Sequence, residues 1–411
     1  MPKPFNTIPS TSSFNPTPFT VNVSEPDLQS FRQLVALSQI GPETYENRVT
    51  DVKDLTSYGI KRSWLANLKD HWATTYEWRK MEEKINSFPN FKVEIEDNGF
   101  GFEVHFAALF SKKKDAVALL LLHGWPGSFL EFLADESSGV LNVFRTKYPE
   151  DELPYHIIVP SLPGYCFSNG PPLDRDFIIE DVARIMDKLM TGLGFSAYVA
   201  QGGDLGSYIA RVLGVQHAAC KMVHLNLCIG VMPESGEEEQ ALNSRDQAAV
   251  RRARDFTNMG SAYARFHGTR PSTIGLVLST SPVALLAWFG EKFLQWSDES
   301  PPDDEILDSI TLWWFTKSFP RAIYPYRQPF GPKPTFFHPE KTWFIEKPLG
   351  YSWFPKDLAP VPVALVAKAG NLVWSRKHEG GGHFAAMEKP MQFATDMEDF
   401  VAQEWPTVQG E

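Results

Sequence analysis

The chain has 411 residues, of which 43% are hydrophobic and 22% charged, a balance typical of a globular protein. It is too long for one minimal domain, so two or three substructures around one large core are expected. Its net charge is −11 at pH 7, and the Lys and Arg residues are scattered, which argues against nucleic-acid binding because phosphates need a basic face.

The cysteines and the apolar runs predict a soluble protein of a reducing compartment. Cys166, Cys220 and Cys228 give no disulfide framework, which favours the cytoplasm. The N-terminal residues lack the apolar core of a signal peptide. The most apolar run, residues 116–122, is far shorter than the ~20 residues that cross a bilayer. We therefore expect no membrane anchor.

Residues 1–112 are expected to form an N-terminal arm and a meander that wraps the core. Residues 1–19 are rich in Pro, Ser, Thr and Asn, which predicts an extended arm over a neighbour, or a disordered one. Ser24 is the predicted cap of a helix with an apolar stripe at Leu28, Phe31, Leu34 and Leu37. A second helix is predicted over residues 63–88, with its aromatic side chains in the core.

From about Phe91 the pattern changes to strands and then to strands that alternate with helices. Strands are predicted at residues 92–96, 102–110, 116–122, 156–162, 197–201 and 222–229. The run 116–122 is apolar throughout, as in a central parallel strand buried on both faces. With a helix at 178–193 and another from Leu205, the pattern predicts an α/β fold with a doubly wound, mostly parallel sheet, whose first part is residues 113–231.

Residues 232–331 interrupt this alternation, because they are helical and aromatic-rich in pattern and lack strand signals. A helical block inserted at this point is expected to be a lid over the carboxyl ends of the strands, where ligands bind. The second part of the core, residues 332–411, is predicted to hold strands at 363–367 and 372–377 and a last helix from about Met391 to Gln403.

Asp204 stands at the apex of a Gly-Gly-Asp-Leu-Gly segment, residues 202–206, between a predicted strand and a predicted helix. This is the pattern of the nucleophile elbow of α/β-hydrolases, in which small neighbours let the strand and the helix approach closely. An ionised carboxylate needs no base to attack an alkyl carbon, and the ester that forms must then be hydrolysed. Asp204 therefore favours epoxides or alkyl halides over amides as substrates. If the Gly-Gly-Asp-Leu-Gly segment stood alone, an Asp204 that only caps the following helix would be a better interpretation than a nucleophile.

His383 follows three glycines shortly before the last predicted helix, where hydrolase folds carry the base. His378 is the alternative, and we expect it to face solvent. The segment His-Gly-Trp-Pro, residues 123–126, follows a buried strand at the place of the second oxyanion donor. The main-chain N–H groups of Trp125 and Leu205 are expected to stabilise the charge that forms when water attacks the ester.

The acid that orients the base is ambiguous in the sequence pattern. A hydrolase fold would place it directly after the predicted strand 363–367, but residues 368–371, Lys-Ala-Gly-Asn, include no carboxylate. Asp357, before that strand, and Glu379, near His383, remain as candidates.

Five short motifs lie along the chain: Tyr-Glu-Trp-Arg at 76–79, His-Gly-Trp-Pro-Gly-Ser at 123–128, Gly-Gly-Asp-Leu-Gly-Ser at 202–207, Phe-Pro-Lys-Asp at 354–357 and Gly-Gly-His-Phe-Ala at 381–385. With them the chain resembles the microsomal-type epoxide hydrolases, in particular their soluble fungal members, over nearly its whole length. The resemblance implies that Asp204 is the nucleophile, His383 the base and Asp357 the acid. It also implies two lid tyrosines that donate protons to the epoxide oxygen, Tyr263 and, in preference to Tyr324, Tyr326.

The resemblance implies the hydrolysis of small hydrophobic epoxides to vicinal diols by water, without a cofactor. No metal is expected, because the ten histidines include no convincing ligand cluster. Soluble relatives suggest a homodimer. Two alternatives stay open: a haloalkane dehalogenase, which commonly has Trp after the nucleophile where this chain has Leu205, and a catalytically silent hydrolase fold that binds a small molecule.

Overall fold

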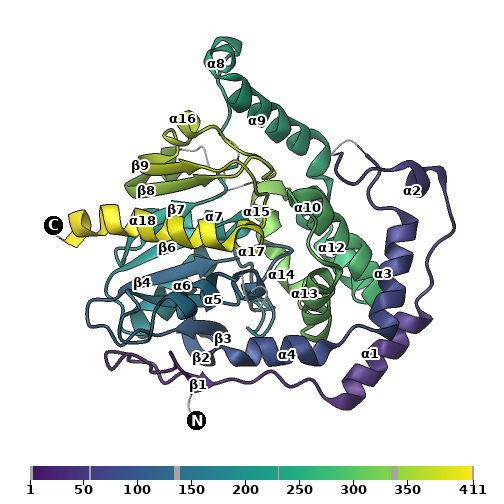
Figure 1. Cartoon of the computed structure of the whole chain (residues 1–411), viewed down its shortest axis with the longest axis horizontal. Helices are drawn as coiled ribbons and strands as arrows, with labels where there is room; N and C mark the ends of the chain where they lie inside the picture. The colour runs from purple at the N-terminus through teal and green to yellow at the C-terminus, as the bar shows by residue number, and fades with distance from the viewer. Residues whose placement is uncertain are drawn as a thin grey trace.

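The computed structural model describes residues 3–54, 57–133, 139–229, 231–332, 334 and 341–409. In these ranges nine strands form one sheet, in the order β1-β2-β3-β5-β4-β6-β7-β8-β9 (Figure 1). They are β1 (Thr17–Pro18), β2 (Asn90–Asp97), β3 (Phe100–Leu109), β4 (Val117–Leu122), β5 (Tyr155–Pro160), β6 (Tyr198–Gly202), β7 (Cys220–Leu225), β8 (Ile345–Trp353) and β9 (Gly370–Lys377). The strands from β5 to β9 in this order are parallel to their neighbours, and those from β1 to β5 are antiparallel. The expected mostly parallel sheet is thus present.

Four helices of the core accompany this sheet: α5 (Val140–Lys147), α6 (Ile179–Gly192), α7 (Asp204–Gln216) and α18 (Pro390–Gln409). α18 passes in front of the sheet in Figure 1 and packs with α5, whereas α6 packs with α7. Every residue of β4 is buried, which is the arrangement that its unbroken apolar run predicts.

The N-terminal helices are α1 (Glu25–Leu37), α2 (Tyr45–Val49), α3 (Arg62–Thr74) and α4 (Trp78–Ser87). The Ser24 side chain caps α1 as expected, by accepting a hydrogen bond from the N–H of Asp27. The predicted apolar stripe is only half right, because Leu34 and Leu37 are exposed. The single helix predicted over 63–88 is wrong, because the helix is interrupted at residues 75–77. There the buried Tyr76 hydroxyl donates to Asp308 of α13 (Asp303–Phe315), 2.7 Å away.

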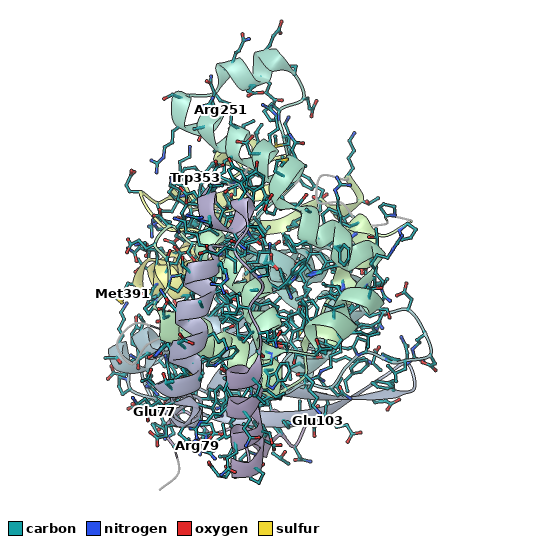
Figure 2. All side chains as sticks on the ribbon, turned by 90° about the vertical axis from the view of Figure 1, so that its right-hand side faces the viewer. Glu77, Arg79, Glu103, Arg251, Trp353 and Met391 are labelled. Carbon is teal, nitrogen blue, oxygen red and sulfur yellow. The ribbon has the colours of Figure 1, made fainter. Side chains whose placement is uncertain are left out.

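The segment between β7 and β8 is helical and lies beyond the carboxyl ends of the central strands (Figure 1). Its helices are α8 (Gly236–Ala241), α9 (Ser244–Asp255), η2 (Phe256–Gly260), α10 (Ala262–Thr269), α11 (Pro271–Leu278), α12 (Pro282–Trp296), α13 (Asp303–Phe315), α14 (Phe319–Ala322), η3 (Tyr324–Tyr326) and α15 (Arg327–Phe330). α1 and α3 pack against α12, and α4 packs against α13. Figure 2 views this side, with the N-terminal helices in front of the inserted ones.

No helix of the described ranges is by itself long and apolar enough to cross a membrane; α11 and α12 meet that criterion only as a pair, and they are bent by 117° at their junction.

The strand predicted at 363–367 is wrong. Residues Val363–Val366 form the short helix α16, and the strand beside β7 is β8, Ile345–Trp353. Its sequence, Ile-Glu-Lys-Pro-Leu-Gly-Tyr-Ser-Trp, has two charged residues and Pro in its first half and Gly at its sixth position, so the apolar signal of a buried strand is interrupted. Its second half is nevertheless buried, because it lies between β7 and β9.

An ion pair joins the meander to the core, because Arg184 and Lys188 of α6 bind the buried carboxylate of Asp97 at the end of β2. Arg184 donates to both oxygens of Asp97, at 2.9 and 2.7 Å, and Lys188 Nζ lies 2.8 Å from Oδ1. The hydrogen bonds from Arg184 lower the pKa of Asp97 to about 2, although burial acts against them.

We predict that Asp97→Asn lowers the free energy of unfolding by about 2 kcal/mol at pH 7, since the folded pKa lies below the unfolded value of 3.8. The loss should shrink as the pH falls from about 4 to 2, because the wild-type carboxylate is protonated in that window. Urea unfolding at several pH values measures this difference, with the exposed Asp174→Asn as the control. A difference that persists unchanged at pH 2 would contradict this role of the charge.

Candidate active site

Asp204 begins α7 directly after β6, at a turn with a strained backbone. Its φ is +43°, in the left-handed region that residues other than Gly rarely adopt. The turn also brings α7 against β4: a Cβ on Gly206 would lie 2.3 Å from the carbonyl oxygen of Leu122. A small residue is therefore required there, as the elbow pattern predicts.

The Asp204 carboxylate is bound at both oxygens. The main-chain N–H of Trp125 donates to Oδ1 at 2.7 Å, and Nε2 of His383 lies 3.2 Å from Oδ2. The Trp125 N–H thus lies where an oxyanion donor is expected. Leu205, the other expected donor, is buried in the first turn of α7, and its role stays a prediction.

His383 joins Asp204 to Asp357. Nδ1 of His383 lies 2.7 Å from Oδ1 of Asp357, which also accepts a hydrogen bond from the N–H of Leu358 at 2.7 Å. Both His383 and Asp357 are buried. Asp357 follows the end of β8 by four residues, so a carboxylate does stand after a strand, where hydrolase folds carry the acid, once the strand is assigned correctly.

The two residues that the sequence left as alternatives, Glu379 and His378, lie elsewhere. Glu379 is 91% exposed and pairs with Arg245 and not with His383. The expectation that His378 faces solvent is wrong: its ring stacks on Phe354, and its Nε2 lies 2.6 Å from the buried Asp396. This pair ties the loop before His383 to α18, a structural role.

The charge state of His383 follows from its two carboxylate neighbours. Burial alone would lower its pKa, but the charge of Asp357 and the hydrogen bonds to Asp204 and Asp357 outweigh burial and raise the pKa to about 10. At neutral pH the unreacted site therefore holds an imidazolium between two carboxylates.

The two lid tyrosines line a cavity together with Asp204. Tyr263 comes from α10 and Tyr326 from η3, and their ring centroids are 5.8 Å apart. The rest of the cavity wall is mainly apolar, with Ile179, Leu205, Leu227, Ile229, Phe256, Phe330 and Leu358 among its lining residues. Tyr324 points elsewhere, because its hydroxyl donates to the carbonyl of Pro163 at 3.0 Å.

Both lid phenols are protonated at neutral pH. Burial, followed by the Asp204 charge, raises the pKa of Tyr263 well above its usual value. The pKa of Tyr326 is raised by burial, followed by its neighbour Tyr263 and the charge of Asp204. Each phenol can therefore donate a proton toward an oxygen in the cavity.

A second cavity also borders Asp204, and its polar lining comes from Asp204, His383, Gln201, Asn226 and Glu131. We call it the polar cavity, although apolar residues such as Leu122, Phe132 and Phe393 line it as well. Gln201 Nε2 donates to Asn226 Oδ1 at 2.8 Å, so amides form part of this wall. Such groups can hold water, whereas the cavity with the tyrosines is suited to an apolar molecule.

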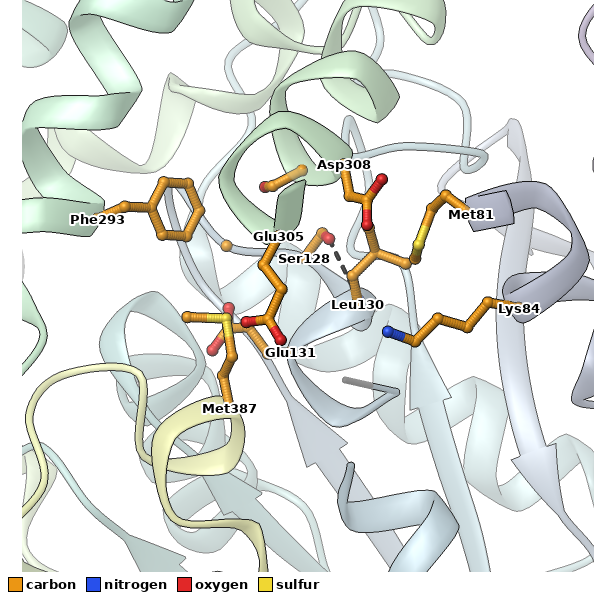
Figure 3. A pocket seen from close by; sticks show the side chains of 11 residues that line it. Met81, Lys84, Ser128, Leu130, Glu131, Phe293, Glu305, Asp308 and Met387 are labelled. Atoms are coloured by element: carbon orange, nitrogen blue, oxygen red, sulfur yellow. Dashed lines mark hydrogen bonds between the residues drawn. The ribbon is translucent and has the colours of Figure 1, made fainter. Parts of the chain in front are cut away.

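Glu131 is a residue that the sequence analysis missed. It lies in η1 (Phe129–Phe132), where it is the single carboxylate of a Phe-Leu-Glu-Phe-Leu run, and that isolation in a buried segment was the available signal. Burial, followed by the charge of Asp204, raises its pKa to about 8, although His383 acts in the opposite direction. Glu131 also borders a neighbouring cavity, into which Glu305 and Met387 point as well (Figure 3).

Metal ligands are not gathered at this site, since in the described ranges no three His, Cys, Asp or Glu side chains are arranged to hold a metal ion.

Comparison with known proteins identifies the family. A family described as "Epoxide hydrolase N terminus" matches residues 16–132, and one described as "alpha/beta hydrolase fold" matches residues 117–273, which confirms the expected fold. The structure of Aspergillus niger epoxide hydrolase is similar with a TM-score of 0.91 and 48% identity, over 98% of this chain and 100% of that one.

Two relatives compared by sequence are also named as epoxide hydrolases. A candidate epoxide hydrolase of Dothistroma septosporum is 44% identical over 97% of this chain and 92% of its own length. Epoxide hydrolase 1 of Sus scrofa is 28% identical over 93% of this chain and 88% of its own length. The chain therefore belongs to the epoxide hydrolase family and has the α/β-hydrolase fold.

Proposed function

We propose that the chain converts epoxides to vicinal diols through an ester on Asp204, with the lid tyrosines as proton donors and His383 as the base. The observation that supports this most is the position of one carboxylate between two cavities. Asp204 borders an apolar cavity that contains two phenols and a polar cavity that contains an imidazole. Each of the two chemical steps thus has a cavity of its own beside Asp204.

In the first step, an oxygen of Asp204 attacks an epoxide carbon, and the C–O bond of the ring breaks. The negative charge moves to the epoxide oxygen, and a proton from Tyr263 or Tyr326 neutralises it. Asp204 is already ionised, so this step needs no base. An uncharged, hydrophobic epoxide fits the lining residues of this cavity.

In the second step, His383 activates water against the ester. Esterification removes the negative charge of Asp204, and with it one of the interactions that raise the pKa of His383. The imidazolium then gives up its proton to solvent more readily and becomes able to accept one from water, while Asp357 keeps the ring oriented. The N–H of Trp125, together with Leu205, would stabilise the oxyanion that forms as the activated water attacks the ester carbon. The acyl C–O bond of the ester then breaks, and the diol oxygen takes a proton from the imidazolium as it leaves.

Glu131 is a further participant in this proposal. At neutral pH its carboxyl is protonated, because its pKa is about 8, and it borders the polar cavity beside His383. A neutral carboxyl group can both donate and accept a hydrogen bond, so it can hold the water that His383 activates.

Homodimer formation and a cytoplasmic location are also proposed. Large apolar side chains are exposed on α1 and α11, namely Leu34, Leu37, Leu276 and Val277, and a second copy could cover them. Sedimentation of the purified protein should give a dimer, and a monomer at micromolar concentration would contradict this proposal.

The proposed cytoplasmic location is supported by three buried cysteines that form no disulfide, because they fit a reducing compartment.

We predict that His383→Gln accumulates an ester whose mass exceeds that of the protein by one epoxide, because alkylation continues while hydrolysis stops. Mass spectrometry after incubation with styrene oxide detects this species. Asp204→Asn is the matched control, since its amide cannot be alkylated in this way, and its turnover should fall by at least about 10³-fold.

Full turnover by Asp204→Asn, or a mass increase that persists when both residues are replaced, would contradict Asp204 as the nucleophile. The same assay separates the alternatives. Halide release from a chloroalkane without diol from styrene oxide would favour a dehalogenase, and thermal stabilisation by epoxides without any product would favour a silent binding protein.

We predict that Glu131→Gln stabilises the protein at high pH. A carboxyl whose folded pKa is raised contributes stability below its unfolded pKa of 4.5, and that contribution is lost as the pH rises through about 8. The variant should therefore match wild type at pH 4.5 and exceed it on the order of 1–3 kcal/mol at pH 9. Thermal melts at both pH values measure this, and equal stability at pH 9 would contradict the raised pKa.

A further inference from the structure

A buried lysine lies against the ring of one of the two lid tyrosines. Lys292 on α12 is 4% exposed, and its Nζ lies 4.9 Å from the ring centroid of Tyr263. The rings of Trp288 and Trp296 are 5.6 and 5.9 Å from the same atom. These tryptophans precede and follow Lys292 by four residues, so one face of the helix carries all three side chains. The ammonium is therefore enclosed by aromatic rings.

Burial of this charge is costly and lowers the pKa of Lys292, whereas the charge and the hydrogen bond of Glu291 act in the opposite direction and favour the ammonium. Lys292 has an ion-pair partner in Glu291, whose side chain is 29% exposed. The ammonium thus lies on the inner side of the pair and the carboxylate nearer to solvent. The charge of Lys292 acts on a neighbour of Tyr263. Burial, followed by this charge, lowers the pKa of His267 to about 3. The ring centroids of His267 and Tyr263 are 5.4 Å apart.

The two lid tyrosines consequently have different electrostatic surroundings. Tyr263 has the ammonium at its ring, whereas Tyr326 has the ring of His267 at 4.9 Å. Nε2 of His267 accepts a hydrogen bond from the indole N–H of Trp288 at 3.1 Å, so this imidazole is neutral. A cation stabilises the negative charge that a phenol gains as it gives up its proton, and a neutral ring does not.

We propose that Lys292 is a positioning residue that makes Tyr263 the stronger proton donor of the pair during ring opening. This inference rests on the proposed role of the two phenols. As the epoxide C–O bond breaks, the Tyr263 hydroxyl proton passes to the epoxide oxygen, and the ammonium stabilises the phenolate until water returns a proton to it. The hydrogen bond with Tyr326 acts in the same direction, since it lowers the pKa of Tyr263 and raises that of Tyr326.

The rate of ester formation in a single turnover tests this proposal, and the His383→Gln background isolates that step. Lys292→Met removes the charge and keeps the length of the side chain, and it should slow ester formation about ten-fold. Lys292→Arg keeps the charge and should stay within about two-fold of the parent. Tyr263→Phe should slow the step more than Tyr326→Phe does.

The decisive comparison adds Lys292→Met to Tyr263→Phe. Without the Tyr263 hydroxyl, loss of the ammonium should have no further effect, because Lys292 acts through that group. Lys147→Met, which breaks an ion pair between α5 and α18, is the control for the loss of a lysine and should leave the rate unchanged.

Two results would overturn the proposal. An equal slowing with and without the Tyr263 hydroxyl would mean that Lys292 only supports the packing of the lid, and an unchanged rate in Lys292→Met would mean that its charge is not used. If Lys292→Met does not fold, Lys292→Gln, which is also neutral, gives the same comparison. Absence of any ester in the His383→Gln parent is a distinct result, which would contradict the ester mechanism itself.

Discussion

The site depends on the position of one carboxylate, that of Asp204, between the N–H of Trp125 and the imidazole of His383. The strained turn between β6 and α7 lifts this side chain above the sheet, and close contact of α7 with β4 fixes it there. In the proposed mechanism the same contacts serve both steps. There the Trp125 N–H first binds the carboxylate and then faces the oxyanion, and His383 first pairs with the charge of Asp204 and is released from it by esterification.

The surroundings of Asp204 divide the two steps in space. The lid supplies an apolar cavity with two protonated phenols, and the core supplies a polar cavity with His383, Glu131 and two amides. Burial and the charge of Asp204 keep the phenols and Glu131 protonated, whereas His383 is charged because two carboxylates outweigh its burial. Low polarity and a small number of charges thus set every protonation state that the proposed mechanism needs.

The sequence predicts those parts of the fold and of the site whose signals are local. The elbow and the helix cap at Ser24 are short patterns, and β4 is a continuous apolar run. β8 escapes prediction because its burial comes from β7 and β9 and not from its own composition, and that error also hid the position of Asp357, which stands after β8. The tyrosines needed the family resemblance. Glu131 and Lys292 needed the structure, because only tertiary contacts bring them to the site.

Isotopic oxygen in a single turnover tests the ester mechanism most directly. With enzyme in excess over the epoxide in H₂¹⁸O, attack by Asp204 transfers a carboxylate oxygen to the substrate, and water then replaces it on the protein. The first diol should therefore contain no ¹⁸O, while mass spectrometry of the peptide around Asp204 should show one. A first diol that carries ¹⁸O, with an unlabelled Asp204, would mean that water attacks the epoxide itself and would contradict the account.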